Sequence, residues 1–341
     1  MSNRSDKIVA IKPLTDSSNS FVRLFSDAIA RQGYQISDFD WNGIERGNAN
    51  VAILHWPHEL TGFGGLKGIR PYLGFRRRIA MARAKGARII WVAHNARPHD
   101  SGWVSTMLMR RFVRSIDGIV HFSHHSRELI AALYTPPARI TQIETVHGHY
   151  LDAMETPFQA ATPAEARVKL VYFGQIRRYK NVDLLAQIAA GLPSELSLMI
   201  GGRRSHEDVA CRIEQIAASA PNIKLDLRAE ALPDADIERL VDAGQGIVLP
   251  YQAILNSGAA IFALSRGRPV LAPNIGSLPE LQAIVGPEWL QLYDGEISAA
   301  DVERFADWLR QRSSPEQPDL SALSWDRVGG DIAGLIDRLL A

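Results

Sequence analysis

A short loop after a predicted strand carries three cations. The strand is expected over residues 169–173, and the loop after it, GQIRRYKN, leads into a helix that begins near Asn181. Gly174 permits a tight turn there. Guanidinium and ammonium groups can neutralise a pyrophosphate without a metal. We therefore predict that the loop binds phosphate groups, with a solvated charged surface as the alternative. The cations are Arg177, Arg178 and Lys180.

A second candidate for anion binding is LPYQAILNSGAAIFALSRGRPVLAP, where a strand ends at Pro250 and a helix is expected over 258–265. The first N–H groups of a helix have no partner within it, and the helix dipole is positive at that end. The alternative is that Asn-Ser-Gly only caps the helix. The turn over 267–270 is expected to be an ordinary helix-to-strand connection. The residues predicted to contact the same phosphates are Tyr251, Asn256, Ser257, Gly258 and Ala259.

Histidines and carboxylates of the first half gather after predicted strands, in HWPHE, HNARPHD and HGHY. Imidazole and carboxylate groups can accept a proton from an alcohol near neutral pH. Asp100 is the first candidate for a general base and Glu59 the second, while His94 is better placed to orient a ligand. For each histidine, a hydrogen-bonded place in the core is the alternative. The other residues predicted to line the cleft or bind an acceptor are His55, Trp56, Asn95, His147, His149 and Tyr150.

The sequence has no spacing typical of metal ligands, since it contains no HExxH and no CxxC. We therefore predict no metal ion and no cofactor. The single cysteine, Cys211, cannot form an intrachain disulfide, which favours a reducing compartment. Neither an apolar signal segment nor a run of about 18 apolar residues occurs. A cytoplasmic protein that does not span a membrane is expected.

Two sheets are needed to position these segments. Short apolar or β-branched runs alternate with segments of helical period, which is typical of βαβ units and parallel sheets. The alternation breaks over residues 152–167, DAMETPFQAATPAEAR, and then restarts. We predict an α/β protein with two Rossmann-like domains facing across a cleft, because parallel sheets bind ligands at the carboxyl ends of their strands. The expected domains are residues 1–155 and 165–322, with the helix of 323–341 crossing back to the first domain.

Length and charge agree with two domains that meet different partners. The chain has 341 residues, 46% of them hydrophobic, and a formal net charge of +1. A single core rarely extends beyond about 250–300 residues. Residues 1–150 hold 20 Lys and Arg against 11 Asp and Glu, whereas the remainder holds 18 against 26. The basic half therefore suits phosphate, nucleic acid or an anionic membrane.

The stretch WVSTMLMRRFVRSI, residues 103–116, favours the membrane among these partners. Its apolar residues are interleaved with Arg110, Arg111 and Arg114, as in an amphipathic helix on an anionic surface. The run 76–78 adds three more arginines. A core helix with a solvated basic edge is the alternative. Nucleic acid is not expected as a partner, because no nucleic-acid motif accompanies the charge.

Segments spread over most of the chain resemble bacterial GT-B glycosyltransferases of exopolysaccharide assembly. The resemblance is greatest to the xanthan-pathway β-mannosyltransferase group, glycosyltransferase family 94. It implies transfer of mannose from GDP-mannose, a co-substrate, to a lipid-pyrophosphate-linked oligosaccharide, with inversion, at the inner face of the cytoplasmic membrane. It also implies a donor site in the second domain and an acceptor site in the first. The segments are ILHWPHEL, AHNARPHD, VHGHY, YFGQIRRYKN, LPYQAILNSGAAIFALSRGRPVLAP, GPEWLQLYDGE and LSWDRVGG.

The chain departs from the larger, retaining glycosyltransferase family 4. That family carries two glutamates eight residues apart in this part of the second domain. The equivalent positions here, placed by matching GRPV, are Ile254 and Phe262. The donor contacts of family 4 therefore do not carry over to this chain.

The sequence thus predicts an inverting glycosyltransferase. A base of the first domain would deprotonate the acceptor hydroxyl, while Arg177, Lys180 and the end of the 258–265 helix stabilise the departing nucleoside diphosphate. The expected partners are a nucleotide sugar, a lipid-linked oligosaccharide and an anionic membrane surface on which the protein is peripheral. The alternatives are a GT-B transferase that uses another nucleotide sugar such as a UDP-sugar, a nucleotide-sugar epimerase of the same architecture, and a non-catalytic binding protein with a degenerate donor site.

Overall fold

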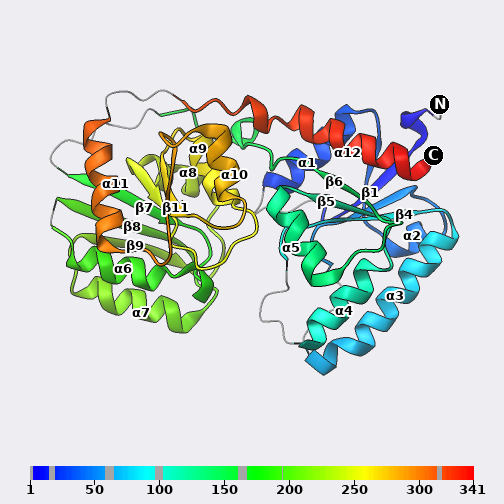
Figure 1. Ribbon diagram of the computed structural model, residues 1–341, viewed down its shortest axis with the longest axis horizontal. Coiled ribbons are helices and arrows are strands. Elements are labelled where there is room, and N and C mark those ends of the chain that lie inside the picture. The colour runs from blue at the N-terminus through cyan, green and yellow to red at the C-terminus, as the bar shows by residue number, and fades with distance from the viewer. Residues whose placement is uncertain are drawn as a thin grey trace. The chain divides into compact units, whose positions relative to one another are not determined.

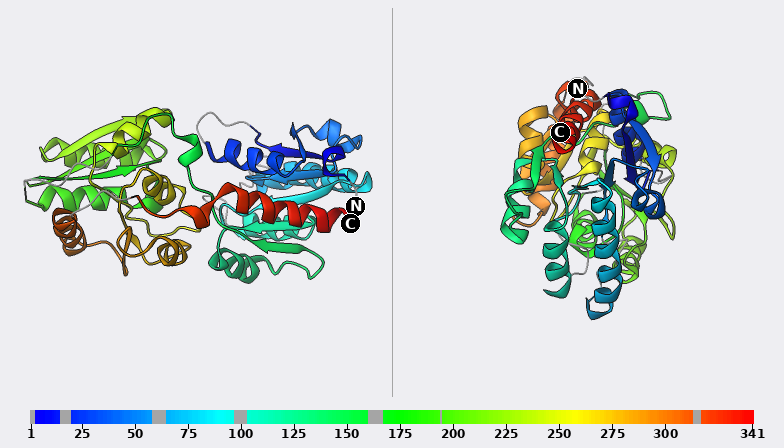
Figure 2. Two further views of the ribbon diagram at one scale, coloured as in Figure 1. Left: turned by 90° about the horizontal axis from the view of Figure 1, so that it is seen from above. Right: turned by 90° about the vertical axis from the view of Figure 1, so that its right-hand side faces the viewer.

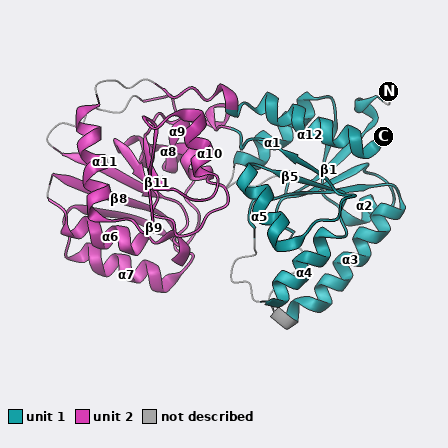
Figure 3. Ribbon diagram, in the orientation of Figure 1, with its two compact units in different colours: residues 1–148, 323–341 teal, residues 149–322 magenta. Residues whose placement is uncertain are grey.

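The chain folds into two compact units, each built on one parallel sheet. A computed structural model describes residues 3–14, 20–57, 65–96, 103–159, 167–193, 195–312 and 317–341. Unit 1 comprises residues 1–148 and 323–341, and unit 2 comprises residues 149–322 (Figure 3). The α/β fold class and the predicted alternation of strands and helices are confirmed.

The sheet of unit 1 has the strand order β2-β1-β3-β4-β5-β6, and all its strand pairs are parallel. Helices pack against it (Figure 1). The central strand β3 is buried along its whole length, as expected for a strand covered on both faces. The elements are β1 Ile8–Lys12, α1 Ser20–Arg31, β2 Gln35–Asp38, α2 Trp41–Glu45, β3 Val51–Leu54, α3 Ile69–Ala84, β4 Arg88–Val92, α4 Trp103–Val113, β5 Gly118–His121, α5 His124–Tyr134, β6 Thr141–Glu144 and α12 Trp325–Leu340.

The C-terminal helix α12 belongs to unit 1 although it follows the whole of unit 2 in sequence. It packs beside α1 and against β6, and Figure 2 shows it (red) alongside α1 (blue). Gly329 makes this close approach possible, because a Cβ atom there would lie 2.5 Å from the carbonyl oxygen of Ala28. Arg4 adds an ion pair to Asp337, 2.5 Å long. The last helix thus completes the core of the first unit.

The sheet of unit 2 has the order β12-β11-β10-β7-β8-β9 and is also parallel throughout its described pairs. The chain leaves β7 towards β8 on one side and returns to β10 on the other. Ligands of open parallel sheets bind where the strand order reverses in this way. The elements are β7 Val168–Phe173, α6 Val182–Gly191, β8 Leu196–Arg203, α7 Glu207–Ala218, β9 Ile223–Arg228, α8 Asp234–Asp242, β10 Gly246–Val248, α9 Gly258–Ser265, β11 Val270–Pro273, α10 Leu278–Val285, β12 Leu290–Tyr293 and α11 Ala299–Gln311.

The division between the units lies at Gly148, before the segment that the sequence indicates as a linker. Residues 149–159 are held to the rest of unit 2 by buried side chains. Glu238 accepts hydrogen bonds from the backbone N–H groups of residues 155 and 156, both 2.8 Å long. Arg266 donates to the carbonyl oxygens of residues 156 and 157, and Arg268 to that of residue 159.

The turn over 267–270 is therefore more than the ordinary connection that the sequence indicates. Gly267 does adopt a positive φ of +62°, as such a turn requires. However, Arg266 and Arg268 on either side of it are almost completely buried. Both pair with Asp242, and Arg266 also lies 3.6 Å from Glu238. The turn thus anchors the start of unit 2.

Replacing Arg266 with alanine is expected to lower the free energy of unfolding by about 3–5 kcal/mol, because the buried carboxylate of Glu238 would lose its ion-pair partner and Asp242 would keep only Arg268. Urea denaturation of the full chain measures the change. Arg239→Ala is the matched control, since Arg239 is exposed and pairs with Asp236 at the surface, and a change below about 1 kcal/mol is expected. Equal effects of the two substitutions would contradict this role of Arg266.

Candidate active site

The loop after β7 is shaped by two glycines that touch each other. Gly174 has a φ of +123°, and its N–H group donates a 3.0 Å hydrogen bond to the carbonyl oxygen of Gly201. A Cβ atom on Gly202 would overlap the carbonyl oxygen of Gly174. Side chains are therefore excluded where the ends of β7 and β8 meet. Gly174 is predicted from the sequence, whereas Gly202 is not, although a Gly-Gly pair at the end of a buried strand is a usable signal.

Lys180 lies at the end of this loop, in the single 3-10 turn Arg178–Lys180 before α6, half-buried and without a carboxylate partner in the described part of the chain. Its ammonium nitrogen is 5.0 Å from the centroid of the Tyr251 ring, and it would lie 3.2 Å from a Cβ atom on Gly174. Burial, and then the nearby charge of Arg177, lower the pKa of Lys180 to about 8. The amine still carries a proton at neutral pH, so the site holds a positive charge that an anion would stabilise.

The two arginines of the loop differ in their surroundings. Arg177 donates through Nε to Gln175, 2.7 Å away, and forms no ion pair with any described residue. The guanidinium of Arg178 instead pairs with Asp208 at 3.0 Å. Of the three cations that the sequence places in this loop, Arg177 and Lys180 are the two left without a carboxylate among the described residues.

The loop between β10 and α9 lies against this loop. The N–H group of Gln252 donates a 2.8 Å hydrogen bond to the carbonyl oxygen of Tyr179. Ser257 caps α9 by accepting a hydrogen bond from the N–H group of Ala260. Gly258 and Ala259 are half-exposed, and their N–H groups donate to no described residue. The structure thus brings Lys180, Arg177 and the N-terminus of the eight-residue helix α9 together at the point where the strand order of this sheet reverses.

The positions equivalent to the family 4 glutamates carry no charge in this fold. The ring of Phe262 packs 5.4 Å from that of Tyr150 and 5.6 Å from that of Phe173. Ile254 lies in the loop before α9, where its carbonyl oxygen is too close to Gly276 for a Cβ atom to fit there. Aromatic and aliphatic side chains therefore occupy the places of the two carboxylates.

Unit 1 holds a separate cluster of histidines and aromatic rings after the ends of its strands. His55 follows β3 and His94 follows β4, and His55 Nδ1 lies 2.7 Å from His94 Nε2. The Trp56 ring stacks on His94 with centroids 4.9 Å apart. Phe21 packs on His94 and His147 at 5.1 and 4.6 Å. Residues from four separate segments of unit 1 thus meet beyond the carboxyl ends of its strands.

These histidines are uncharged at neutral pH. Burial lowers the pKa of His55 to about 3 and that of His147 to about 4, and it takes the pKa of His94 well below its usual value. Since the neutral rings of His55 and His94 share one hydrogen bond, one nitrogen donates and the other accepts. His55 Nε2 is buried with no partner among the described residues. Such rings can orient a hydroxyl group without changing their charge.

Trp325, the first residue of α12, closes this cluster. Its ring lies 5.4 Å from that of Phe21, and a Cβ atom on Gly148 would overlap its indole. The glycine of the HGHY segment is therefore needed to seat a tryptophan from the far end of the sequence. The next residues, His149 and Tyr150, belong to unit 2, where the N–H group of Tyr150 donates to Ser265. Both residues lie within the range 1–155 that the sequence predicts for the first domain.

Comparison with known proteins identifies the chain. No protein-family model matches it. A GDP-mannose:glycolipid 4-beta-D-mannosyltransferase from Xanthomonas campestris pv. campestris is 32% identical over 284 residues, which cover 82% of this chain and 77% of the relative. A second sequence of that name and species gives the same values. The chain belongs to this family of glycosyltransferases. The resemblance drawn from its motifs is confirmed.

Solved structures agree on the GT-B fold of this glycosyltransferase. Sucrose-phosphate synthase from Thermosynechococcus elongatus matches with a TM-score of 0.69 at 14% identity, over 98% of each chain. HepE of Anabaena, crystallised with UDP, also matches with a TM-score of 0.69, at 10% identity, over 97% of this chain and 100% of its own. At such low identities the likeness concerns the fold alone.

Two predicted catalytic residues of the glycosyltransferase lie outside the described residues. These are Asp100 and Glu59, so their role as base stays a prediction. His94 is described and lies in the histidine cluster, and Asn95 beside it is half-buried. In the described parts of the chain, no three or more His, Cys, Asp or Glu side chains come together as a metal site. The expectation of a reaction without metal stays a prediction too.

The arginine-rich segments of unit 1 are partly brought together. Arg76 on α3 lies with Arg111 and Arg114 of the 103–116 stretch around one hollow. Arg78 instead pairs with Glu45, and Arg110 donates to a backbone carbonyl. No helix in the described parts of the chain has both the length and the hydropathy that a bilayer crossing requires.

Proposed function

We propose that this glycosyltransferase moves mannose from GDP-mannose to a lipid-pyrophosphate-linked oligosaccharide in exopolysaccharide assembly, with inversion at the anomeric carbon. The observation that carries the proposal is the 32% identity, over 82% of the chain, to an enzyme named for this donor and for a glycolipid acceptor. The protein would act at the inner face of the cytoplasmic membrane as a peripheral protein. The excess of basic residues in its first half supports this location.

The geometry of unit 2 supports binding of the nucleoside diphosphate there. Lys180 and Arg177 lack carboxylate partners among the described residues, and the amides of Gly258 and Ala259 have no acceptor within that part of the chain. Gly174 leaves the approach to Lys180 open. Together they would hold the diphosphate and stabilise the charge that develops on it as the glycosidic bond breaks. This positive charge makes a metal ion unnecessary in the proposal.

The acceptor would bind unit 1 at the carboxyl ends of its strands, beside the histidine cluster. The acceptor hydroxyl oxygen attacks the anomeric carbon of mannose, and the bond from that carbon to the β-phosphate oxygen breaks. GDP leaves with the electron pair, and the proton of the hydroxyl passes to a carboxylate, Asp100 first and Glu59 second. The neutral imidazole of His94 would orient the acceptor sugar. Displacement from the opposite face gives inversion.

The test of this proposal is a donor panel. The purified protein is incubated with lipid-linked oligosaccharide and, separately, with GDP-mannose, GDP-glucose and UDP-glucose that carry a labelled sugar. Label from GDP-mannose is expected in the lipid product, and far less from the other two donors. Transfer from UDP-glucose alone would replace the proposed donor. No transfer and no thermal stabilisation by any nucleotide would contradict the assignment of this chain as an active transferase.

The affinity for GDP is expected to fall as the pH rises through about 8, the pKa of Lys180. Below this pH the lysine is charged and attracts the diphosphate. Above it the free protein holds a neutral amine that must take up a proton to bind, so the loss approaches about tenfold for each pH unit. Calorimetric titration with GDP at a series of pH values measures it. Lys180→Arg should flatten the profile, because arginine stays charged over this pH range. A flat profile in the wild type would show that Lys180 does not bind the phosphates of GDP.

A further inference from the structure

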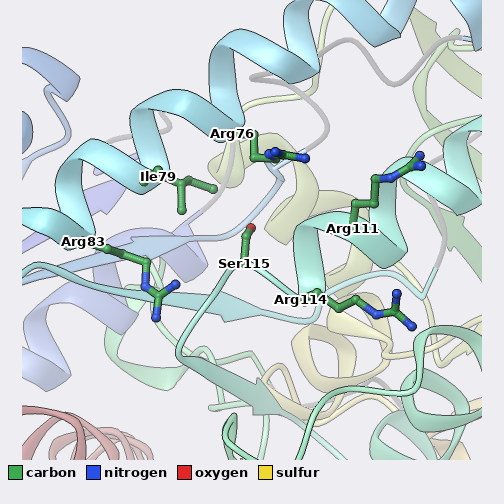
Figure 4. Close-up of a pocket in the computed structure, with 7 residues that line it drawn as sticks. Arg76, Ile79, Arg83, Arg111, Arg114 and Ser115 are labelled. Atoms are coloured by element: carbon green, nitrogen blue, oxygen red, sulfur yellow. The ribbon is translucent and has the colours of Figure 1, made fainter.

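The face formed by α3 and α4 of unit 1 carries a hollow of about 390 Å³ lined by four arginines (Figure 4). Arg76 and Arg83 come from α3, where residues 76, 80 and 83 share one face because they are four and three residues apart. Arg111 comes from α4, and Arg114 directly follows that helix. We call these four residues the arginine pocket. It lies in the opposite unit from the proposed donor site.

Most of the charge in the arginine pocket is not neutralised by the described parts of the protein. Arg83 pairs with the buried carboxylate of Asp117 at 2.9 Å, which fixes its position. Arg76, Arg111 and Arg114 make neither an ion pair nor a side-chain hydrogen bond with any described residue. Three such guanidiniums repel one another unless an anion lies between them. Their planar donors fit a phosphate group, which can accept two hydrogen bonds from each.

Large apolar side chains are exposed on the same two helices. Trp103 is 75% exposed and Leu73 is 55% exposed. Trp103 lies eight residues, or about two helical turns, before Arg111 on α4, and Leu73 lies seven residues, or about two turns, before Ala80 of the pocket wall on α3. Each therefore shares a stripe of its helix with the pocket. A free anion would use the arginines and leave the tryptophan in water, whereas a membrane offers phosphates and an apolar layer together.

We propose that the arginine pocket binds the phosphate of an anionic phospholipid headgroup, while Trp103 and Leu73 enter the membrane interface. Unit 1 would then bind the membrane through a defined site for one lipid headgroup and not only through a diffuse basic surface. The inference rests on the proposed function only in that a lipid-linked acceptor requires the enzyme to reach a membrane. The class of ligand is a phosphodiester or phosphomonoester of a lipid.

The test is sedimentation of the full chain with vesicles of phosphatidylcholine, with and without phosphatidylglycerol. The wild type is expected to bind the vesicles that contain phosphatidylglycerol. The pair Arg111→Ala and Arg114→Ala should lower the partition coefficient about 25-fold, about fivefold for each arginine. The control pair, Arg23→Ala and Arg46→Ala, removes the same charge from α1 and from the end of α2, away from α3 and α4, and should have a much smaller effect. Equal losses from both pairs would overturn a defined site.

A second arm separates lipid from free phosphate and tests the variants without vesicles. Calorimetry with a short-chain, water-soluble phosphatidylglycerol should show one site that the Arg111 and Arg114 pair abolishes. Tight binding of inorganic phosphate in the pocket, with vesicle binding unchanged in the pair, would overturn the lipid as occupant. Neither arm uses a nucleotide sugar or an acceptor. Vesicle binding without mannosyl transfer would therefore count against the proposed function, and transfer without a preference for phosphatidylglycerol would count against the pocket.

Discussion

Replacing Lys180 with methionine is expected to lower kcat/KM for the nucleotide sugar by about 10²- to 10³-fold, the usual loss when one strong donor to a developing charge is removed. The half-buried ammonium has no described carboxylate partner and lies beside the glycine turn after β7. The diphosphate that departs is therefore its proposed partner. Initial rates of sugar transfer, with the donor concentration varied, measure the effect.

The fold should survive the loss of Lys180, so the effect can be assigned to binding and catalysis. Burial lowers the pKa of this lysine, which means that folding disfavours its charged form. A neutral methionine should leave the thermal midpoint unchanged or raise it. Arg178→Met is the matched control, because Arg178 is engaged by Asp208 at the surface. A loss of activity as large in Arg178→Met as in Lys180→Met would show that the whole loop, and not Lys180, carries the effect.

Asp100→Asn is expected to reduce transfer by about 10²- to 10⁴-fold, the range that general base catalysis contributes. Asparagine keeps the shape of the side chain and cannot accept the proton of the acceptor hydroxyl. The affinity for the nucleotide, which the proposal assigns to unit 2, should remain. Transfer rates and thermal stabilisation by GDP, measured on the same variant, separate the two effects.

Glu59→Gln serves as the comparison for Asp100, since it removes the second candidate base in the same conservative way. A smaller loss than in Asp100→Asn is expected. If Glu59→Gln proves the more severe change while Asp100→Asn retains substantial activity, the order of the two candidates is reversed. If both variants remain active, the base is neither carboxylate.

Much of the fold could be predicted from the sequence, because buried parallel strands are continuous apolar runs. Residues 51–54 and 170–173 are examples, and both lie inside their sheets. Strands β2 and β12 are less evident in the sequence, and both lie at sheet edges. Edge strands are covered less completely, so their side chains, QISD and LQLY, keep polar positions that hide the strand pattern.

The candidate donor site could be predicted only in its outline. Loops at the carboxyl ends of strands are found from the strand pattern, which led to Gly174 and Lys180. The partner of Arg178 could not be predicted, because Asp208 is brought to it by α7. The closeness of Gly202 to Gly174 likewise depends on the pairing of β7 with β8.

The boundary between the units and the arginine pocket depend on contacts between distant segments. The charged residues at 238, 242, 266 and 268 bind the start of unit 2, and nothing local in the sequence indicates that they are buried together. The arginines near residues 76 and 111 appear in sequence as two separate basic runs. The packing of α3 beside α4 makes them one site.

The most direct test of the central claim is the anomeric configuration of the product formed from GDP-mannose. Labelled mannose is transferred to the lipid-linked oligosaccharide, and the one-bond carbon–proton coupling at its anomeric carbon is measured by NMR. The donor carries the α configuration, so inverting transfer predicts a β-linked mannose. An α-linked product, or release of free mannose without transfer to the lipid, would contradict the account.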